Sequence, residues 1–105
     1  MAEQVITQGF NGGAISVKKG DTLKLELPEN PTTGYRWAVG PQDTKVLALT
    51  GDEYEGAGGA VGGGGLRIFR FSAKGSGRTS LQCRLSRSWQ AGPARGLFSV
   101  HIDVK

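Results

Sequence analysis

The sequence predicts an all-β protein, built as a sandwich or a barrel of about seven short strands. Apolar and polar residues alternate with a period of two in several segments, which is typical of strands that bury one face. Turn-forming residues separate these segments at short intervals, and no segment carries a sustained apolar period of 3.6 residues with helix caps. We therefore expect little helix and two sheets that cover each other's apolar faces.

Short alternating runs mark the strands expected in the first half of the chain. Residues 22–27 show the pattern best, because leucines occupy every second position while Lys24 and Glu26 face water. Residues 46–49 are short enough to form either a strand or a helical turn. The expected elements, in order, are residues 5–7, 15–17, 22–27, 35–39 and 46–49.

The second half carries three further alternating runs, each with its apolar side chains on one face. A hairpin turn is expected at residues 74–78, where two glycines and a serine lie between two of the runs. Two long loops are expected, at the glycine-rich residues 51–65 and at residues 86–96. The expected strands are residues 67–73, 79–85 and 97–104.

Length and composition limit the class of protein. The 105 residues fit a single domain, residues 1–105, and 37% hydrophobic with 21% charged residues suits a soluble globular chain. No apolar run approaches the length of a membrane span, so no membrane partner is expected. The formal charge of +4 favours acidic partners. No signal peptide is visible, which predicts either a cytoplasmic protein or a mature exported or periplasmic form.

Reactive side chains are few. Cys83 is the only cysteine, which excludes an intramolecular disulfide, and its alternating apolar surroundings predict a buried thiol rather than a nucleophile paired with His101. Ser99, His101 and Asp103 share one strand face, but adjacent members stand about 6.6 Å apart along the strand, too far for a catalytic triad. One cysteine and one histidine cannot form the usual structural zinc site. We therefore expect no enzyme, no metal and no cofactor.

Two charged clusters have ordinary explanations. Asp52, Glu53 and Glu55 are expected on a solvated loop, because their spacing matches no calcium-binding loop. Five arginines in the second half would suit nucleic acid only if several aromatic residues stood among them, and only one is expected to be exposed there. No nucleic-acid partner is therefore expected. The arginines are Arg67, Arg70, Arg84, Arg87 and Arg95.

Residues 30–35, with the sequence Asn-Pro-Thr-Thr-Gly-Tyr, are the most informative segment. Pro31 fixes its own φ and Gly34 can take a positive φ, so this loop is expected to be short and rigid. Thr32 and Thr33 place two hydroxyls at its tip. A rigid projecting loop loses little entropy on docking, which suits insertion into the cleft of another molecule. The alternative is an ordinary turn between two strands.

The remaining loops offer two further contact candidates. Trp37 lies in an alternating strand and is expected in the core, whereas Trp89 lies in a polar loop and is expected to be an exposed binding residue. The glycine run lacks the Lys-Ser or Lys-Thr of a phosphate-binding loop, so it is a flexible surface loop or one whose backbone lies against a partner. Alternate connections of a sandwich project from the same end, which predicts that these loops lie beside the Asn30 loop.

Three motifs together resemble the chagasin family of inhibitors of papain-like cysteine peptidases, over nearly the whole chain. Residues 30–37 resemble the family's NPTTG(Y/F)xW signature. Residues 62–65 resemble its GxGG motif; residues 56–59 fit the same pattern, but the later run lies directly before an expected strand, as the family's motif does. Residues 87–89 resemble its RPW motif, with Ser88 in place of the proline.

The resemblance implies an immunoglobulin-like β-sandwich of about seven or eight strands. It implies a reversible, tight-binding inhibitor that blocks the catalytic cleft of papain-like, cathepsin-like cysteine peptidases with three adjacent loops, and we expect a monomer. The Asn30 loop would enter the cleft between the other two loops. The implied peptidase-binding residues are Asn30, Pro31, Thr32, Thr33, Gly34, Tyr35, Gly62, Gly63, Gly64, Gly65, Arg87 and Trp89.

A generic β-sandwich module that binds carbohydrate or another protein is the alternative function. Such a module would use a sheet face or other loops, and it would leave papain active. An exposed row of aromatic residues on one sheet would favour it. The sequence shows no such row.

Overall fold

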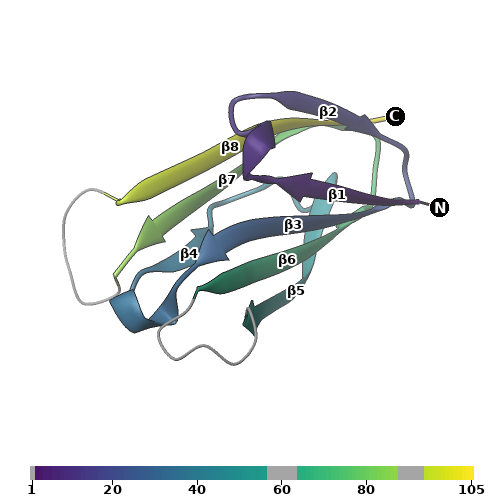
Figure 1. Cartoon of the computed structure of the whole chain (residues 1–105). Coiled ribbons are helices and arrows are strands. Elements are labelled where there is room, and N and C mark those ends of the chain that lie inside the picture. Colours follow the sequence, from purple (N-terminus) through teal and green to yellow (C-terminus); the bar gives the residue numbers. More distant parts are fainter. Residues whose placement is uncertain (1, 57–63, 88–93) are drawn as a thin grey trace.

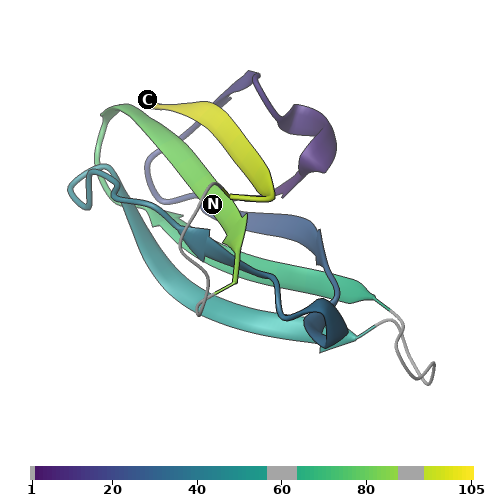
Figure 2. The same ribbon diagram turned by 90° about the vertical axis from the view of Figure 1, so that its left-hand side faces the viewer.

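The computed structural model describes residues 2–56, 64–87 and 94–105. Within these ranges, eight strands form two four-stranded sheets that pack face to face (Figures 1 and 2). The predicted all-β sandwich is therefore confirmed. The strands are β1 (Glu3–Thr7), β2 (Ala14–Val17), β3 (Thr22–Glu29), β4 (Arg36–Val39), β5 (Leu47–Gly56), β6 (Gly65–Ala73), β7 (Gly77–Ser86) and β8 (Gly96–Val104).

The two sheets have similar topologies. The first has the strand order β1-β3-β6-β5 and the second the order β2-β8-β7-β4. β1 pairs with β3 and β2 with β8 in parallel, while all other neighbouring strands are antiparallel. Helical structure in the described ranges consists of two single turns, η1 (Gln8–Phe10) and η2 (Pro31–Thr33). None of the described helices is long and apolar enough to cross a membrane.

The core lies between the sheets and follows the predicted alternation. Each fully buried leucine or phenylalanine side chain contributes about 1.5–3 kcal/mol relative to an exposed one. Trp37 and Cys83 are both buried, as predicted. The core residues include Leu23, Leu25, Leu27, Leu47, Phe69, Phe71, Leu81, Phe98, Val100 and Ile102.

The loop predicted at residues 51–65 is partly wrong. β5 continues to Gly56 and pairs with β6 through Gly51 opposite Arg70 and Gly56 opposite Gly65, after a register shift between Leu49 and Gly51. Glycine content suggested a loop, but β6 supplies a backbone hydrogen-bonding partner, and this segment forms the outer strand of the sheet. The predicted loop placement of the three acidic residues is also wrong, since Asp52, Glu53 and Glu55 lie on β5.

Several connections meet at the end of the sandwich that lies away from both chain termini. Figure 1 shows η2 at this end, together with the last residues of β5 and β7 and the first residues of β6 and β8. The β3–β6 register places Glu29 opposite Gly65, so the start of the Asn30 loop lies beside the end of the glycine segment. The fold therefore brings the described parts of the motif segments to one end.

Candidate functional site

Hydrogen bonds within the Asn30 loop hold it in a compact turn. Asn30 Oδ1 accepts bonds from the backbone N–H of Thr32 at 3.1 Å and from its hydroxyl at 2.7 Å. The hydroxyl of Thr33 donates to the Asn30 carbonyl at 2.7 Å and accepts from the Tyr35 N–H at 3.2 Å. Gly34 has φ of +79°, a conformation that favours glycine. The predicted short and internally restrained loop is confirmed, and it begins with the turn η2.

Two arginines from the connection between β7 and β8 lie against Tyr35. The Arg87 guanidinium stands 4.3 Å from the ring centroid of Tyr35, and that of Arg95 stands 4.9 Å from it. Arg87 Nε also donates to the Thr33 carbonyl at 3.0 Å, and the Arg95 N–H donates to the Leu85 carbonyl at 2.7 Å. The first residue of the third motif, Arg87, and Arg95 beyond that motif thus both lie against the first motif.

Gly65 stands where a side chain has no room. A Cβ at this position would lie 2.8 Å from Gly56 Cα and 2.5 Å from Tyr54 Oη, and closer still to the Glu55 carbonyl oxygen. Among the described residues, the atom nearest to a Cβ at Gly64 is the Glu29 carbonyl oxygen at 3.6 Å. The glycine at position 65 is therefore required by close backbone packing, whereas the described residues leave space for a methyl group at position 64.

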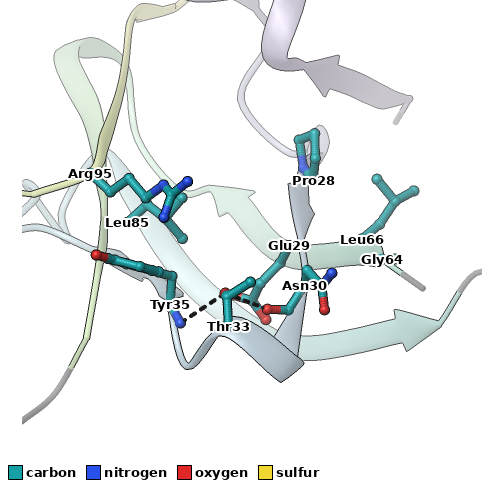
Figure 3. A pocket seen from close by; sticks show the side chains of 10 residues that line it. Pro28, Glu29, Asn30, Thr33, Tyr35, Gly64, Leu66, Leu85 and Arg95 are labelled. Atoms are coloured by element: carbon teal, nitrogen blue, oxygen red, sulfur yellow. Dashed lines mark hydrogen bonds between the residues drawn. The ribbon is translucent and has the colours of Figure 1, made fainter. Parts of the chain in front are cut away.

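An open hollow of about 500 Å³ lies between these segments. Figure 3 shows Tyr35, Leu85 and Arg95 on one side of it and Leu66 with Gly64 on the other. Carbon-rich groups from β3, β6 and β7 form much of its wall, and the Asn30 loop forms its outer edge. The Asn30 loop, Gly64–Gly65 and Arg95 from the third predicted loop therefore line one hollow, and Arg87 adjoins it through its contacts with Thr33 and Tyr35.

The site residues predicted from the sequence fall into two groups, according to whether the structure describes them. Asn30 to Tyr35, Gly64, Gly65 and Arg87 lie at the site just described. Gly62, Gly63 and Trp89 lie outside the described residues. Burial raises the pKa of the Cys83 thiol to about 12, which disfavours a thiolate nucleophile, and the His101 ring nitrogen lies 3.2 Å from the Ser80 hydroxyl on the neighbouring strand.

The sequence reasoning missed a buried ion pair directly beneath the Asn30 loop. Glu29 and Arg67 are 5% and 9% exposed, and Arg67 Nη2 donates to Glu29 Oε2 at 2.7 Å. Glu29 Oε1 accepts the Trp37 N–H at 2.7 Å, and Arg67 Nη1 donates to Asp52 at 3.0 Å. The alternating pattern of residues 22–29 could have indicated this buried carboxylate, because Glu29 falls on the same inward face as the leucines of β3.

Arg67 keeps its charge in this position. Burial by itself lowers the pKa of the guanidinium, but the hydrogen bonds and charges of Glu29 and Asp52 outweigh that effect and raise the pKa above its usual value. A charged, hydrogen-bonded pair therefore ends the apolar core at the side where the loops converge.

Comparisons with known proteins agree with the motif resemblance. Residues 16–102 match the family described as Chagasin family peptidase inhibitor I42. Chagasin of Trypanosoma cruzi is 26% identical over 106 residues, which covers 94% of this chain and 96% of that protein. The crystal structure of the cysteine protease inhibitor EhICP2 from Entamoeba histolytica is similar, with a TM-score of 0.89 at 22% identity, covering 99% of this chain and 96% of that one.

A further solved structure, of PbICP-C in complex with falcipain-2, has the same fold with a TM-score of 0.70 at 14% identity. It covers 98% of this chain and 89% of that one. The family match spans most of the sequence and includes all three motif segments. The chain therefore belongs to the chagasin family of peptidase inhibitors, and it is an inhibitor rather than an enzyme.

Proposed function

We propose that this protein, through its domain of residues 1–105, is a reversible, tight-binding inhibitor of papain-like cysteine peptidases. The observation that carries the proposal is the convergence of the Asn30 loop, Gly64–Gly65 and Arg87 at one end of the sandwich. Family membership supports it, and so does the fold shared with PbICP-C, which was solved in complex with falcipain-2. The three loops together form a wedge that blocks the catalytic cleft.

The Asn30 loop suits the centre of that wedge. A papain-like cleft holds a reactive thiolate beside a histidine, and an inhibitor must fill it without offering a peptide bond in attack geometry. Thr32 and Thr33 are exposed at the tip, while the Asn30 carbonyl already accepts bonds from the Thr33 N–H and hydroxyl. A restrained turn of this kind covers the nucleophile and resists cleavage.

The two other segments are proposed to contact the walls of the cleft. Gly62 to Gly64 would offer their backbone for pairing with the peptidase main chain, and Gly65, which lies between Glu29 and Gly56 in the sheet, would anchor them. Trp89 would pack on an aromatic surface beside the cleft, because large aromatic residues supply much of the energy of such interfaces. Arg87 would add polar contacts, in addition to those it makes with Thr33 and Tyr35.

Titration of active-site-calibrated papain tests this function. We expect inhibition constants from nanomolar to sub-micromolar, full recovery of activity after dilution, and an intact inhibitor chain by mass spectrometry. Full papain activity at about 10 µM of the protein, corresponding to a binding free energy weaker than about −7 kcal/mol, would contradict the proposal.

The alternative of a sheet-face binding module receives no support from the described surface. In the part of the chain that the structure describes, Phe10 is the one aromatic side chain classed as exposed, and Phe69, Phe71 and Phe98 are buried. A carbohydrate-binding row of aromatic residues is therefore not formed by the described strands.

A further inference from the structure

We propose that Glu29 and Arg67 are positioning residues for inhibition, which close the base of the Asn30 loop and hold it in its binding geometry. This inference rests on the proposed function. Neither residue belongs to the three loop motifs, and both are too buried to contact a peptidase. They act through the residues that begin and end the loop.

The pair supplies the last inward-facing side chains of two adjacent core strands, because Gly65, opposite Glu29 on β6, has no side chain. On β3, Glu29 follows Leu23, Leu25 and Leu27 at alternate positions, and all four are buried. On β6, Arg67 stands opposite Leu27 and precedes the buried Phe69 on the same face. The apolar core thus ends in one carboxylate and one guanidinium, immediately below η2.

Two hydrogen bonds cross the base of the loop. Glu29 Oε1 accepts the backbone N–H of Trp37 at 2.7 Å, and the indole N–H of Trp37 donates to the Pro28 carbonyl at 2.8 Å. The chain therefore leaves the sandwich at Glu29 and returns at Trp37 with its two ends tied together. Arg67 holds the carboxylate in place through Nε at 3.1 Å and Nη2 at 2.7 Å from Oε2.

Arg67 also connects this base to the strand that leads into the glycine segment. Its Nη1 donates to Asp52 Oδ1 at 3.0 Å, and its guanidinium stands 5.7 Å from the centroid of the Tyr54 ring on β5. Tyr54 in turn limits the space at Gly65. One guanidinium thereby links the base of the first loop to the strand that precedes the second.

Stability alone does not account for such a pair. Removing two charges from water is costly, and well-packed apolar residues of similar size are often as stabilising or more so. The side chains of Arg67 and Glu29 are 10% and 1% exposed, so that desolvation applies to both. What apolar residues cannot supply is an acceptor for the Trp37 N–H, which would then have to move towards water and open the loop base.

The decisive experiment replaces the pair with apolar residues in the variant Glu29→Leu/Arg67→Met. We expect a folded protein whose inhibition constant for papain is raised at least about tenfold, mainly through faster dissociation. The matched control is Glu53→Gln/Arg70→Gln, which removes an exposed ion pair with an N–O distance of 3.0 Å between β5 and β6. The inhibition constant of the control should stay within about twofold of that of the parent protein.

Glu29→Gln provides a milder second variant in case the double variant does not fold. Its single side-chain oxygen can accept the Trp37 N–H or bond Arg67 but cannot replace both carboxylate oxygens, so we expect inhibition weakened at least about threefold. An inhibition constant equal to that of the parent protein, in either variant once its fold is verified by circular dichroism, overturns the inference.

Backbone ¹⁵N relaxation separates this inference from the proposed function. Order parameters of Thr32, Thr33 and Tyr35 should fall in the Glu29 variants and stay unchanged in the control. Unchanged order parameters in a folded Glu29→Leu/Arg67→Met protein would refute the positioning role, even if the parent protein failed to inhibit papain. Absence of inhibition by the parent protein would refute the proposed function alone.

Discussion

The guanidinium of Arg87 covers the ring of Tyr35 at 4.3 Å from its centroid and donates a hydrogen bond of 3.0 Å to the neighbouring Thr33 carbonyl. This contact ties the segment that begins at Arg87 to the Asn30 loop across 54 residues of sequence. The family motif has a proline where this chain has Ser88, and a proline would restrict the backbone at that point. Arg87 and Arg95, one on each side of that position in the sequence, both contact the Tyr35 ring.

Replacing Arg87 should weaken inhibition more than it weakens the fold. In Arg87→Gln the ring contact and the bond to Thr33 are both lost, and such interactions at exposed sites contribute about 0.5–1 kcal/mol each. We expect an inhibition constant raised about five- to thirtyfold in a papain titration. Arg87→Lys should not restore it, because an ammonium lacks the planar guanidinium that stacks on the ring.

The matched control for this substitution is Arg84→Gln. Arg84 is an exposed arginine on β7, the strand that precedes Arg87, and within the described residues it forms no ion pair or ring contact. Its replacement should leave the inhibition constant unchanged, because a single exposed charge contributes little to binding. Equal weakening by both substitutions would indicate that net charge, and not loop restraint, explains the effect of Arg87.

Trp89 is expected to be a major contributor to binding. The substitution Trp89→Ala should raise the inhibition constant about thirtyfold, since truncation of a central interface aromatic costs about 2 kcal/mol or more. The thermal unfolding midpoint should stay close to that of the parent protein. An unchanged inhibition constant would show that Trp89 does not contribute to binding.

Gly65 and Gly64 should respond very differently to the addition of one methyl group. Gly65→Ala forces backbone and Tyr54 apart, and overpacking of this kind costs about 1–3 kcal/mol of stability. Gly64→Ala adds a methyl group whose nearest described neighbour is 3.6 Å away, so the unfolding free energy of this variant should change little. Urea unfolding of the two variants measures the difference, and equal midpoints would contradict the packing argument.

The thiol of Cys83 should be unreactive in the folded protein. Burial raises its pKa from 9.0 to about 12, so the nucleophilic thiolate is scarce at neutral pH. A disulfide reagent at pH 8 should label Cys83 only after addition of guanidinium chloride. Rapid labelling without denaturant would show that the strand opens or that the thiol is accessible.

The same shift predicts a loss of stability in alkali. The folded state holds the thiol proton more tightly than the unfolded state does, so this contribution is complete below pH 9 and declines as the pH rises towards about 12. Cys83→Ala lacks the titrating group and should show a smaller decline in unfolding free energy over that range. Parallel declines in both proteins would contradict the assignment to Cys83.

Local sequence patterns were sufficient for the class of fold and for most strands. The alternation in β3, β6, β7 and β8 depends only on which side chains prefer water, and the structure confirms it. Residues 51–56 were mispredicted because their strand conformation depends on backbone pairing with β6, which local composition does not display. A strand of mixed polar residues and glycine is specified by its partner more than by its own composition.

The amino-acid sequence alone determined the strand alternation, the short turn at residues 30–35 and the family to which the chain belongs. These properties depend on backbone preferences and on neighbouring residues, which a sequence displays directly. Only the tertiary structure decided that Glu29 meets Arg67 and that Arg87 covers Tyr35. Such contacts join residues 38 and 52 positions apart, and their distances are set by how two twisted sheets pack.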